Sequence, residues 1–311
     1  MSRSSFQHRS CNRRTFLKGS LTALAGSCLA PVLPVQAASV PHVSVATGGI
    51  AQATRAAVKS QGGMGAFVQP GQKVIIKPNM SFDQPPEKAT NTHPEVVRTL
   101  AAMCEEAGAA RVWVLDNPLR DAELCLERSG IKDVEKDLNR CSIQGIYDSS
   151  GFREVDIPQG EQLRSTEVME EVLQADVLIA APVAKHHSSG GVSLSMKGMM
   201  GLILNRGAFH WRYDLHRAIV DLCTLLKADL TVIDASRALT TNGPAGPGKV
   251  LQLDSIVASR DMVAADAQVV SMVPWYGKRL EPRNIKHIRF AHERGLGRMD
   301  LEQLKVETIR L

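Results

Sequence analysis

The hydrophobic and polar positions of this chain form short, wholly apolar runs separated by longer segments whose apolar residues recur at helical spacing. Apolar runs bounded by turn residues are typical of buried parallel strands. Their alternation with amphipathic helices predicts an α/β fold with a mixed, mainly parallel sheet flanked by helices, in a single domain. We expect strands at 43–46, 73–77, 111–115, 152–157, 177–183, 229–233 and 304–309, and helices at 51–59, 92–107, 121–128, 134–139, 167–174, 213–227 and 261–273.

The clearest strand–helix–strand unit joins the second and third predicted strands. Thr92 and Glu95 have the spacing of a capping box at the start of its helix. The two strands should lie parallel, which places Lys77 and Asp116 at the same edge of the sheet. The long polar loop after Asn79 lies on that edge too, and structureless loops of such length are often functional.

The stretch from residue 176 to residue 201 carries the densest chemistry. Its apolar run ends in Lys185, His186 and His187, a Ser/Gly loop follows, and Lys197 lies on a helix-like segment beyond the loop. Open α/β sheets bind ligands at the carboxyl ends of their strands, so this segment is the predicted centre of a site.

Polar residues follow four of the predicted strands, and parallel strands direct such residues into one crevice. The alternative is that each of them only caps a strand or faces solvent. As catalytic candidates we take Lys77, Asp116, Lys185, His187 and Lys197; as ligand-binding candidates, Asn79, Ser188, Ser189, Gly190, Gly191, Ser193, His210 and Asp234.

These residue types favour binding of a small anion together with proton transfer. Lysines can neutralise a carboxylate or phosphate, and crowding lowers their pKa, so that one becomes a base or an amine nucleophile. His187 is the candidate proton shuttle, and the loop after it offers backbone N–H groups as an anion cradle. No Walker pattern accompanies that loop. The histidines at 186, 187, 210 and 216, with Asp116 and Asp234, also suffice for one divalent metal ion, so a metal or other cofactor stays an open alternative.

Charge excludes one class of partner. The 311-residue chain has a formal charge of +5, and its first 37 residues contain five basic and no acidic residues. The remaining chain therefore balances 32 basic against 32 acidic residues, which argues against nucleic acid as a partner. No apolar run after residue 37 is long enough to predict a transmembrane helix in the mature protein.

The first 37 residues have the pattern of a cleaved export signal. Arg13 and Arg14, followed by Phe-Leu-Lys, resemble a twin-arginine signal, and cleavage is expected after Ala37. We therefore expect residues 38–311 to be the mature domain, located in the periplasm after passage through the twin-arginine translocase. A Sec signal with a chance arginine pair and a lipoprotein site at Cys28 are the alternatives.

The cysteines give no metal-cluster signature. The mature region contains Cys104, Cys125, Cys141 and Cys223 without any CxxC pair, so neither a zinc ribbon nor an iron–sulfur cluster is predicted. Cys125 and Cys141 could pair in an oxidising compartment, but the sequence does not test their geometry.

Four stretches resemble the family called domain of unknown function 362: residues 74–79, 92–117, 177–201 and 295–306. The most specific element is the pattern Lys-x-His followed by Ser-Leu-x-x-Lys, formed here by Lys185, His187, Ser193, Leu194 and Lys197. The family often has Asn after the last lysine, where this chain has Gly198. Some members carry ferredoxin-like cysteine clusters. This chain lacks those cysteines, so the resemblance implies no such cluster here. It supports the fold and the site, and leaves the reaction open.

Two functions fit these observations. The first is an exported enzyme acting on a small anionic carboxylate or phosphate, with a metal or cofactor inserted before export as a variant. The second is a non-catalytic periplasmic protein that binds a ligand or metal, or serves in maturation, through the same crevice. Only the enzyme would convert its ligand.

Overall fold

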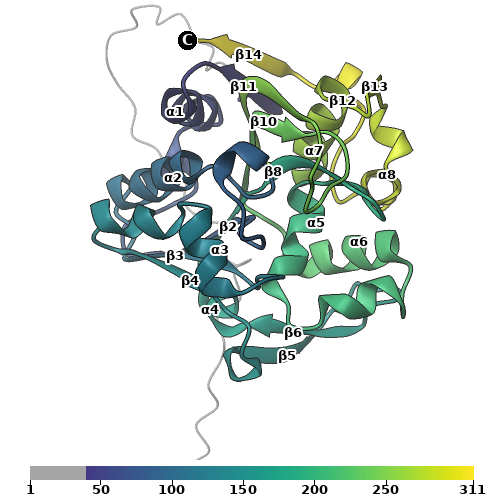
Figure 1. Cartoon of the computed structure of the whole chain (residues 1–311), viewed down its shortest axis with the longest axis horizontal. Coiled ribbons are helices and arrows are strands. Elements are labelled where there is room, and N and C mark those ends of the chain that lie inside the picture. The colour runs from purple at the N-terminus through teal and green to yellow at the C-terminus, as the bar shows by residue number, and fades with distance from the viewer. Residues whose placement is uncertain (1–39) are drawn as a thin grey trace, which may run out of the picture. The chain divides into compact units, whose positions relative to one another are not determined.

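A mixed β-sheet runs through residues 40–311, the part of the chain that the computed structural model describes (Figure 1). The predicted leader lies outside the described residues. The strands follow in the order β14 (Val306–Arg310), β1 (Val43–Thr47), β11 (Val250–Ser259), β10 (Leu230–Leu239), β7 (Val177–Ala181), β2 (Lys73–Pro78), β3 (Arg111–Asp116) and β4 (Cys141–Gly145). Two further strands, β8 (Val183–His187) and β9 (Gly191–Ser193), extend it through β10.

Most neighbouring strands of this sheet run parallel. Strands β10, β7, β2, β3 and β4 form a continuous parallel block, and only β11 and β9 pair antiparallel with their neighbours. The predicted mixed, mainly parallel sheet is therefore confirmed. Two small hairpins lie outside it: β5 (Phe152–Asp156) with β6 (Ser165–Met169), and β12 (Pro274–Trp275) with β13 (Lys278–Arg279).

Helices cover both faces of the sheet. In Figure 1, α1 (Ile50–Ser60) and α2 (Pro94–Glu106) lie together on one side, while α5 (Ser195–Gly198), α6 (Leu215–Leu225), α7 (Met262–Met272) and α8 (Lys286–Glu293) gather on the other. Helices α3 (Ala122–Arg128) and α4 (Glu170–Gln174) are shorter than α1, α2, α6, α7 and α8. Single 3₁₀ turns occupy Met64–Ala66, Pro86–Lys88, Lys132–Asp137, Ser149–Gly151, Met199–Leu202, Arg206–His210, Pro282–Asn284 and Leu301–Gln303.

The apolar core is divided between the two faces. Consecutive residues of β2 point in opposite directions, so Ile75 joins the cluster under α6 and α7, and Ile76 joins the cluster under α1 and α2. Both side chains are fully buried. Burial on both faces explains why these strands read as unbroken apolar runs, each such side chain contributing about 1.5–3 kcal/mol.

The predicted capping box of α2 is wrong. Its N-cap is His93, whose Nδ1 accepts the N–H of Glu95 at 3.1 Å. The hydroxyl of Thr92 instead accepts the N–H of Asn79 at 2.9 Å and donates to the carbonyl of Ala181 at 2.7 Å. Thr92 thus joins two parallel strands, because partners distant in sequence displaced the local cap.

Several element boundaries also differ from expectation. The strand expected at 177–183 is broken at Pro182, which has no N–H for a sheet ladder, and the chain continues as β8. The first three residues of the helix expected at 167–174 belong to strand β6, and the helix expected at 134–139 is a 3₁₀ turn. Strands β4, β9 and β11 and helix α8 were not predicted, because their apolar residues are too few or too irregularly spaced.

Two further expectations concern a disulfide between Cys125 and Cys141 and the presence of a transmembrane helix. Cys104, Cys125, Cys141 and Cys223 are all free, so Cys125 and Cys141 form no disulfide in this structure. In residues 40–311 no helix combines the length and the apolar character that crossing a bilayer requires.

Candidate functional site

A pocket of about 280 Å³ lies where the carboxyl ends of β2 and β3 meet α5 and the turn at 206–210. The chain thus places it at the sheet edge where open α/β folds bind ligands. Its lining includes seven of the predicted site residues: Lys77, Asn79, Asp116, His187, Ser193, Lys197 and His210.

Lys77 and Asp116 form a buried ion pair at the base of this pocket. Lys77 Nζ lies 3.1 Å from Asp116 Oδ1, and each side chain is 1% exposed. The other oxygen, Oδ2, accepts the N–H of Met80 at 3.0 Å and the hydroxyl of Ser81 at 2.9 Å, and Lys77 also donates to the carbonyl of Pro78. Burial lowers the pKa of Lys77, although Asp116 opposes the shift.

Gly201 packs directly against this ion pair. A Cβ at Gly201 would lie 2.1 Å from Asp116 Oδ1 and 2.5 Å from Lys77 Cε, closer than real contacts allow. The Gly201 carbonyl accepts the N–H of Asn117 at 2.8 Å. Only glycine therefore lets the turn after α5 approach the ends of β2 and β3.

Lys185 lies within β8 rather than at a strand end, and it is buried. Its Nζ donates to the carbonyl of Thr90 at 2.5 Å and sits 5.0 Å from the ring centroid of Phe82, which lines the pocket. Burial, together with the charges of Lys197 and Lys77, lowers the pKa of Lys185 to about 7. Its amine is therefore partly unprotonated near neutral pH.

Lys197 projects from α5, a single helical turn, and is also buried. Burial and the neighbouring Arg206 lower its pKa to about 8. A Cβ at Gly190 would lie 3.1 Å from Lys197 Cδ, so the absence of a side chain at Gly190 leaves room for the lysine stem.

His187 has a defined hydrogen-bonding role. Its Nδ1 accepts the N–H groups of Ser189 and Gly190, both at 3.2 Å. The neutral ring therefore carries its proton on Nε2. Burial and the charges of Lys197 and Lys185 lower its pKa to about 2, so the ring stays neutral. It stacks on His210 with centroids 6.1 Å apart.

The Ser/Gly loop at 188–191 is the tight connection of the β8–β9 hairpin, whereas the sequence suggested a loop before a helix. The N–H groups of Ser189 and Gly190 bind His187, and that of Ser188 donates to the carbonyl of Gly243 at 3.3 Å. These groups are satisfied within the chain. The loop positions His187 instead of presenting an anion cradle.

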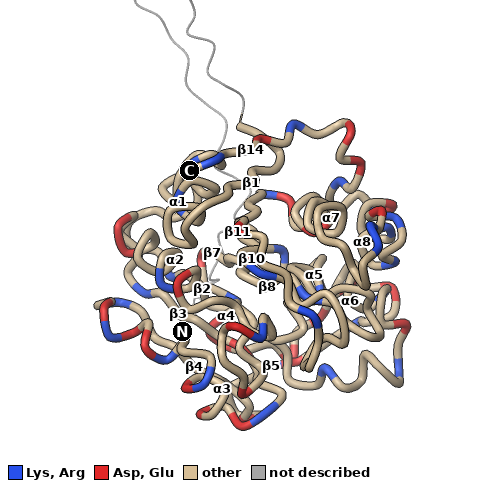
Figure 2. The backbone as a smooth tube through the Cα atoms, turned by 45° about the horizontal axis from the view of Figure 1, so that its top comes forward, with Lys and Arg blue, Asp and Glu red and all other residues tan. Residues whose placement is uncertain are grey.

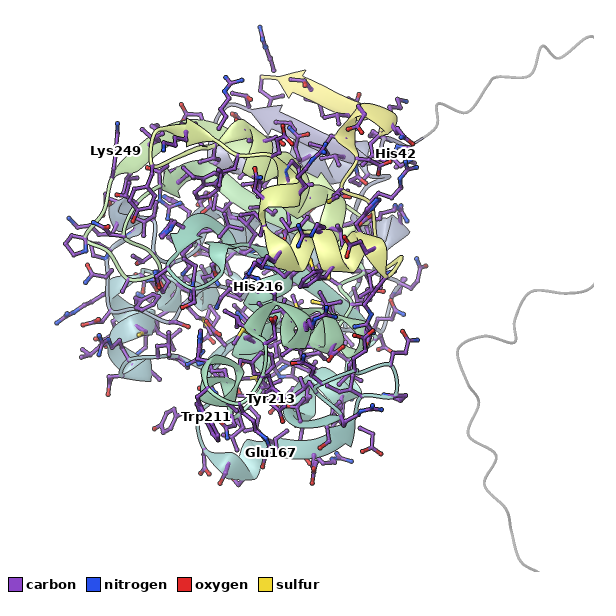
Figure 3. The ribbon with its side chains drawn as sticks, turned by 90° about the vertical axis from the view of Figure 1, so that its right-hand side faces the viewer. His42, Glu167, Trp211, Tyr213, His216 and Lys249 are labelled. Atoms are coloured by element: carbon purple, nitrogen blue, oxygen red, sulfur yellow. The ribbon has the colours of Figure 1, made fainter. Side chains whose placement is uncertain are left out.

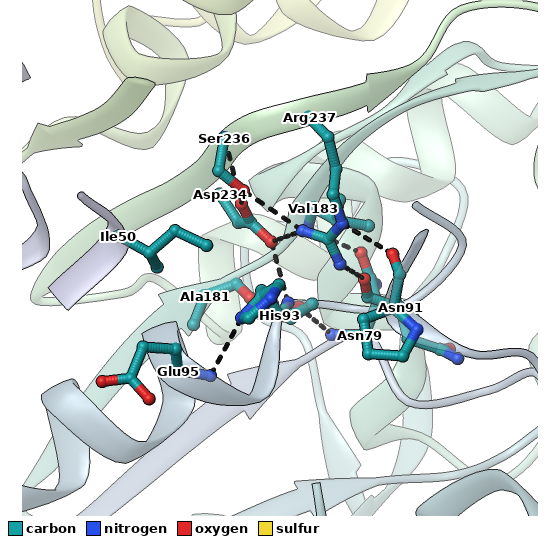
Figure 4. A network of polar contacts seen from close by, with 12 residues as sticks. Ile50, Asn79, Asn91, His93, Glu95, Ala181, Val183, Asp234, Ser236 and Arg237 are labelled. Carbon is teal, nitrogen blue, oxygen red and sulfur yellow. Dashed lines mark hydrogen bonds and ion pairs between the residues drawn. The ribbon is translucent and has the colours of Figure 1, made fainter. Parts of the chain in front are cut away.

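Asp234 does not line the pocket. It belongs to a separate buried network, shown in Figure 4, in which its Oδ2 pairs with Arg237 at 2.7 Å and accepts the N–H of His93 at 2.8 Å. Its Oδ1 accepts the Ser236 hydroxyl at 2.6 Å, and Arg237 also donates to the carbonyl of Asn91 at 3.1 Å. This network ties β10 to the start of α2.

Arg206 is the pocket cation that sequence reasoning missed. It lies in the turn after the apolar segment 199–204, and burial lowers its pKa. The polar break after that segment was its only signal. Figure 2 shows how basic and acidic positions mix along the described chain, with basic positions on β8 and near α5 toward the middle.

The two residues that flank His210 in the chain are aromatic. Trp211 is 76% exposed and projects outward from the ribbon in Figure 3, next to the labelled Tyr213. Phe209, by contrast, is buried and packs edge to face against Tyr213, with the ring centroids 6.2 Å apart. This turn is thus anchored by Phe209 while His210 remains at the pocket.

The donor set around the pocket differs from that of ordinary metal centres. Among the described residues, no three His, Cys, Asp or Glu side chains converge in a manner that could hold a metal ion. His216 lies away from the pocket lining and pairs with His287, their Nδ1 atoms 3.3 Å apart. The pocket is dominated by amines and a guanidinium, which bind anions.

A sequence model of the family described as "Domain of unknown function (DUF362)" matches residues 74–271. The chain belongs to the DUF362 family. The resemblance seen in the sequence is therefore confirmed, and the match includes every pocket-lining residue. This DUF362 protein is also 25% identical, over 261 residues, to the thylakoid-associated protein sll1697 of Synechocystis, covering 81% of this chain and 77% of that one.

Among solved structures, the lactate racemase apoprotein from Thermoanaerobacterium thermosaccharolyticum is similar at a TM-score of 0.46 and 12% identity. The alignment covers 70% of this DUF362 protein and 54% of the racemase chain, so the chain spans about half the length of that protein.

Proposed function

We propose that this protein is an exported enzyme that acts on a small anionic ligand, a carboxylate or phosphate, in the pocket at the ends of β2 and β3. One observation carries the proposal. Lys77, Lys185, Lys197 and Arg206 are gathered at or beside the pocket, against the one carboxylate, Asp116, that lines it in the described chain. A buried excess of positive charge favours an anion as its partner.

Two buried lysines with lowered pKa values are the candidate bases. With pKa values of about 7 and about 8, Lys185 and Lys197 hold a useful fraction of free amine near neutral pH. One amine takes up a proton from the ligand and becomes an ammonium group. The electron pair left on the ligand is stabilised by Lys77 and Arg206.

His187 acts in this scheme as a neutral hydrogen-bond donor. Its Nδ1 already accepts two backbone N–H groups, so the proton on Nε2 is the one available to a ligand. This role replaces the proton shuttle expected from the sequence, because a ring with so low a pKa does not protonate near neutral pH.

Hydrogen exchange tests the proposal directly. The purified protein would be incubated in D₂O with a panel of small carboxylates and phosphate esters, and exchange at carbon would be followed by proton NMR. We expect at least one compound to exchange, and Lys197→Met or Lys185→Met to slow exchange at least about 100-fold. Calorimetry on the same panel measures binding.

Binding without exchange or other conversion would identify a non-catalytic binding protein. If no anion of the panel binds, both the enzyme and the binding-protein hypotheses are wrong. Native mass spectrometry with elemental analysis of protein isolated from the producing cell would reveal a retained cofactor or metal. An anionic cofactor would fit the same cations.

Export through the twin-arginine translocase is part of the proposal. It is supported by Arg13, Arg14 and the following Phe-Leu-Lys. Replacing both arginines by lysine should leave unprocessed precursor in the cytoplasm, detected by fractionation and mass measurement. A processed, periplasmic double variant would refute this route.

A further inference from the structure

A second hollow, of about 270 Å³, adjoins the pocket at Phe82. Phe82 lines both spaces. Leu119 and Pro244 line the pocket, while their chain neighbours Arg120 and Ala245 line the second hollow. Three separate segments therefore contribute the same or consecutive residues to the two spaces, which makes them adjoining compartments that share Phe82.

The second hollow is basic. It is lined by Lys88 and Arg120 and by one acid, Asp83, whose carboxylate pairs with Arg128 at 3.0 Å. Pairing offsets the charge of Asp83, so Lys88 and Arg120 set the sign of the potential. Both are exposed, and they can therefore reorient toward a ligand.

Thr90 connects the second hollow to a lysine beside the first pocket. It is 1% exposed, lines this hollow, and its Oγ1 has no hydrogen-bond partner among the described residues. Its carbonyl accepts from Lys185, the buried lysine beside the first pocket. The two compartments are therefore linked through the backbone of Thr90 and the amine of Lys185.

The loop at 243–248 contributes lining residues to both compartments. Pro244 lines the first pocket, and the residues from Ala245 to Gly248 line the second hollow. Asn242 holds the loop by donating to the carbonyl of Pro247 at 3.1 Å and by accepting from Tyr276 at 3.0 Å. This loop, rich in Gly and Pro, is therefore a wall that the two compartments share.

We propose that the ligand is elongated and carries two anionic groups. One group binds Lys77 and Arg206 in the first pocket, the apolar middle crosses Phe82, and the second group binds Lys88 and Arg120. The ligand class is therefore a dicarboxylate or a phosphorylated carboxylic acid. This inference rests on the proposed function of the first pocket and adds the second charge to its ligand.

Calorimetry with matched probes tests this arrangement. Linear dicarboxylates from succinate to suberate, and phosphonocarboxylates of similar length, would be compared with monocarboxylates of equal chain length. We expect the best two-charge probe to bind about tenfold more tightly than its monocarboxylate partner. In Lys88→Gln/Arg120→Gln this advantage should vanish, while monocarboxylate affinity stays unchanged.

The matched control is Lys278→Gln/Arg279→Gln, which removes two exposed charges on β13, away from both compartments. It should retain the advantage of the two-charge probes. If monocarboxylates bind and the second charge adds nothing, the second compartment is refuted and the first pocket stands. If no probe of either kind binds, both proposals fail.

Discussion

The carboxylate of Asp266 on α7 holds Ser195, the first residue of α5, by hydrogen bonds of 2.9 Å to its N–H and 2.6 Å to its hydroxyl. The N–H of Met196 donates to the same carboxylate at 3.1 Å. Because α5 is a single turn, a buried acid on another helix fixes the position of Lys197. Asp266 is thus a positioning residue that no local sequence pattern indicated.

Replacing Asp266 by Ala should lower the free energy of unfolding by about 2–4 kcal/mol, since three donors at the start of α5 lose their acceptor. Ser195→Ala removes only the hydroxyl contact and should cost about 1 kcal/mol. Urea denaturation measures both. The pKa of Lys197, measured by NMR, should shift more in Asp266→Ala than in Ser195→Ala. A cap that is merely structural would leave that pKa unchanged.

Stability should rise as pH increases from about 7 to about 8; at higher pH the thiols of Cys104, Cys125, Cys141 and Cys223, whose pKa values burial raises, oppose the trend because they ionise first in the unfolded chain. The folded-state pKa values of Lys185 and Lys197, about 7 and about 8, lie below the value near 10.4 of an unfolded lysine. In that interval the unfolded chain binds more protons, so higher pH favours the folded state, and falling pH removes this stability. Urea denaturation across this range measures the slope, which should flatten in Lys185→Met. An unchanged slope would contradict the low pKa.

Gly201→Ala should disrupt the Lys77–Asp116 ion pair, because its Cβ would overlap Asp116 Oδ1. We expect a loss of about 1–3 kcal/mol in stability and weaker anion binding, measured by denaturation and calorimetry. Gly207→Ala is the matched control. Gly207 lines the same pocket, but its Cβ would meet nothing closer than 3.7 Å. Equal behaviour of the two variants would refute the steric explanation.

Asp234→Asn should reduce stability without changing the affinity of the pocket for anions, because Asp234 belongs to the network of Figure 4. Arg237→Ala should cost more, about 3–5 kcal/mol, since it leaves a buried carboxylate unpaired. Thermal denaturation and calorimetry distinguish the two effects. A loss of anion affinity in Asp234→Asn, at unchanged stability, would return Asp234 to the site.

The strands buried on both faces were predicted from their apolar runs; β5 and β14, which are largely exposed, were predicted as well. Residues 73–77 and 111–115 appear as β2 and β3 with small boundary shifts, because continuous burial leaves a continuous apolar run. Strand β4 at the sheet edge and the irregular strand β11 carry mixed polar and apolar residues, so local periodicity did not reveal them.

The site was predictable where parallel strand ends met at one edge. Lys77 and Asp116 follow adjacent parallel strands, and their meeting required only the direction of those strands. Asp234 follows the same rule in sequence, yet β10 continues past it to Leu239, so its carboxylate remains inside the sheet region and pairs with Arg237.

By itself, the sequence determined the α/β class, the parallel strand pairs and the residue types that gather at their ends, because burial patterns and strand direction are local properties. Only the tertiary structure decided that Arg206 joins the pocket, that Asp266 holds α5, and that the Ser/Gly loop turns its N–H groups toward His187. Each depends on contacts between segments far apart in the chain or on the direction of a tight turn, which no local pattern encodes.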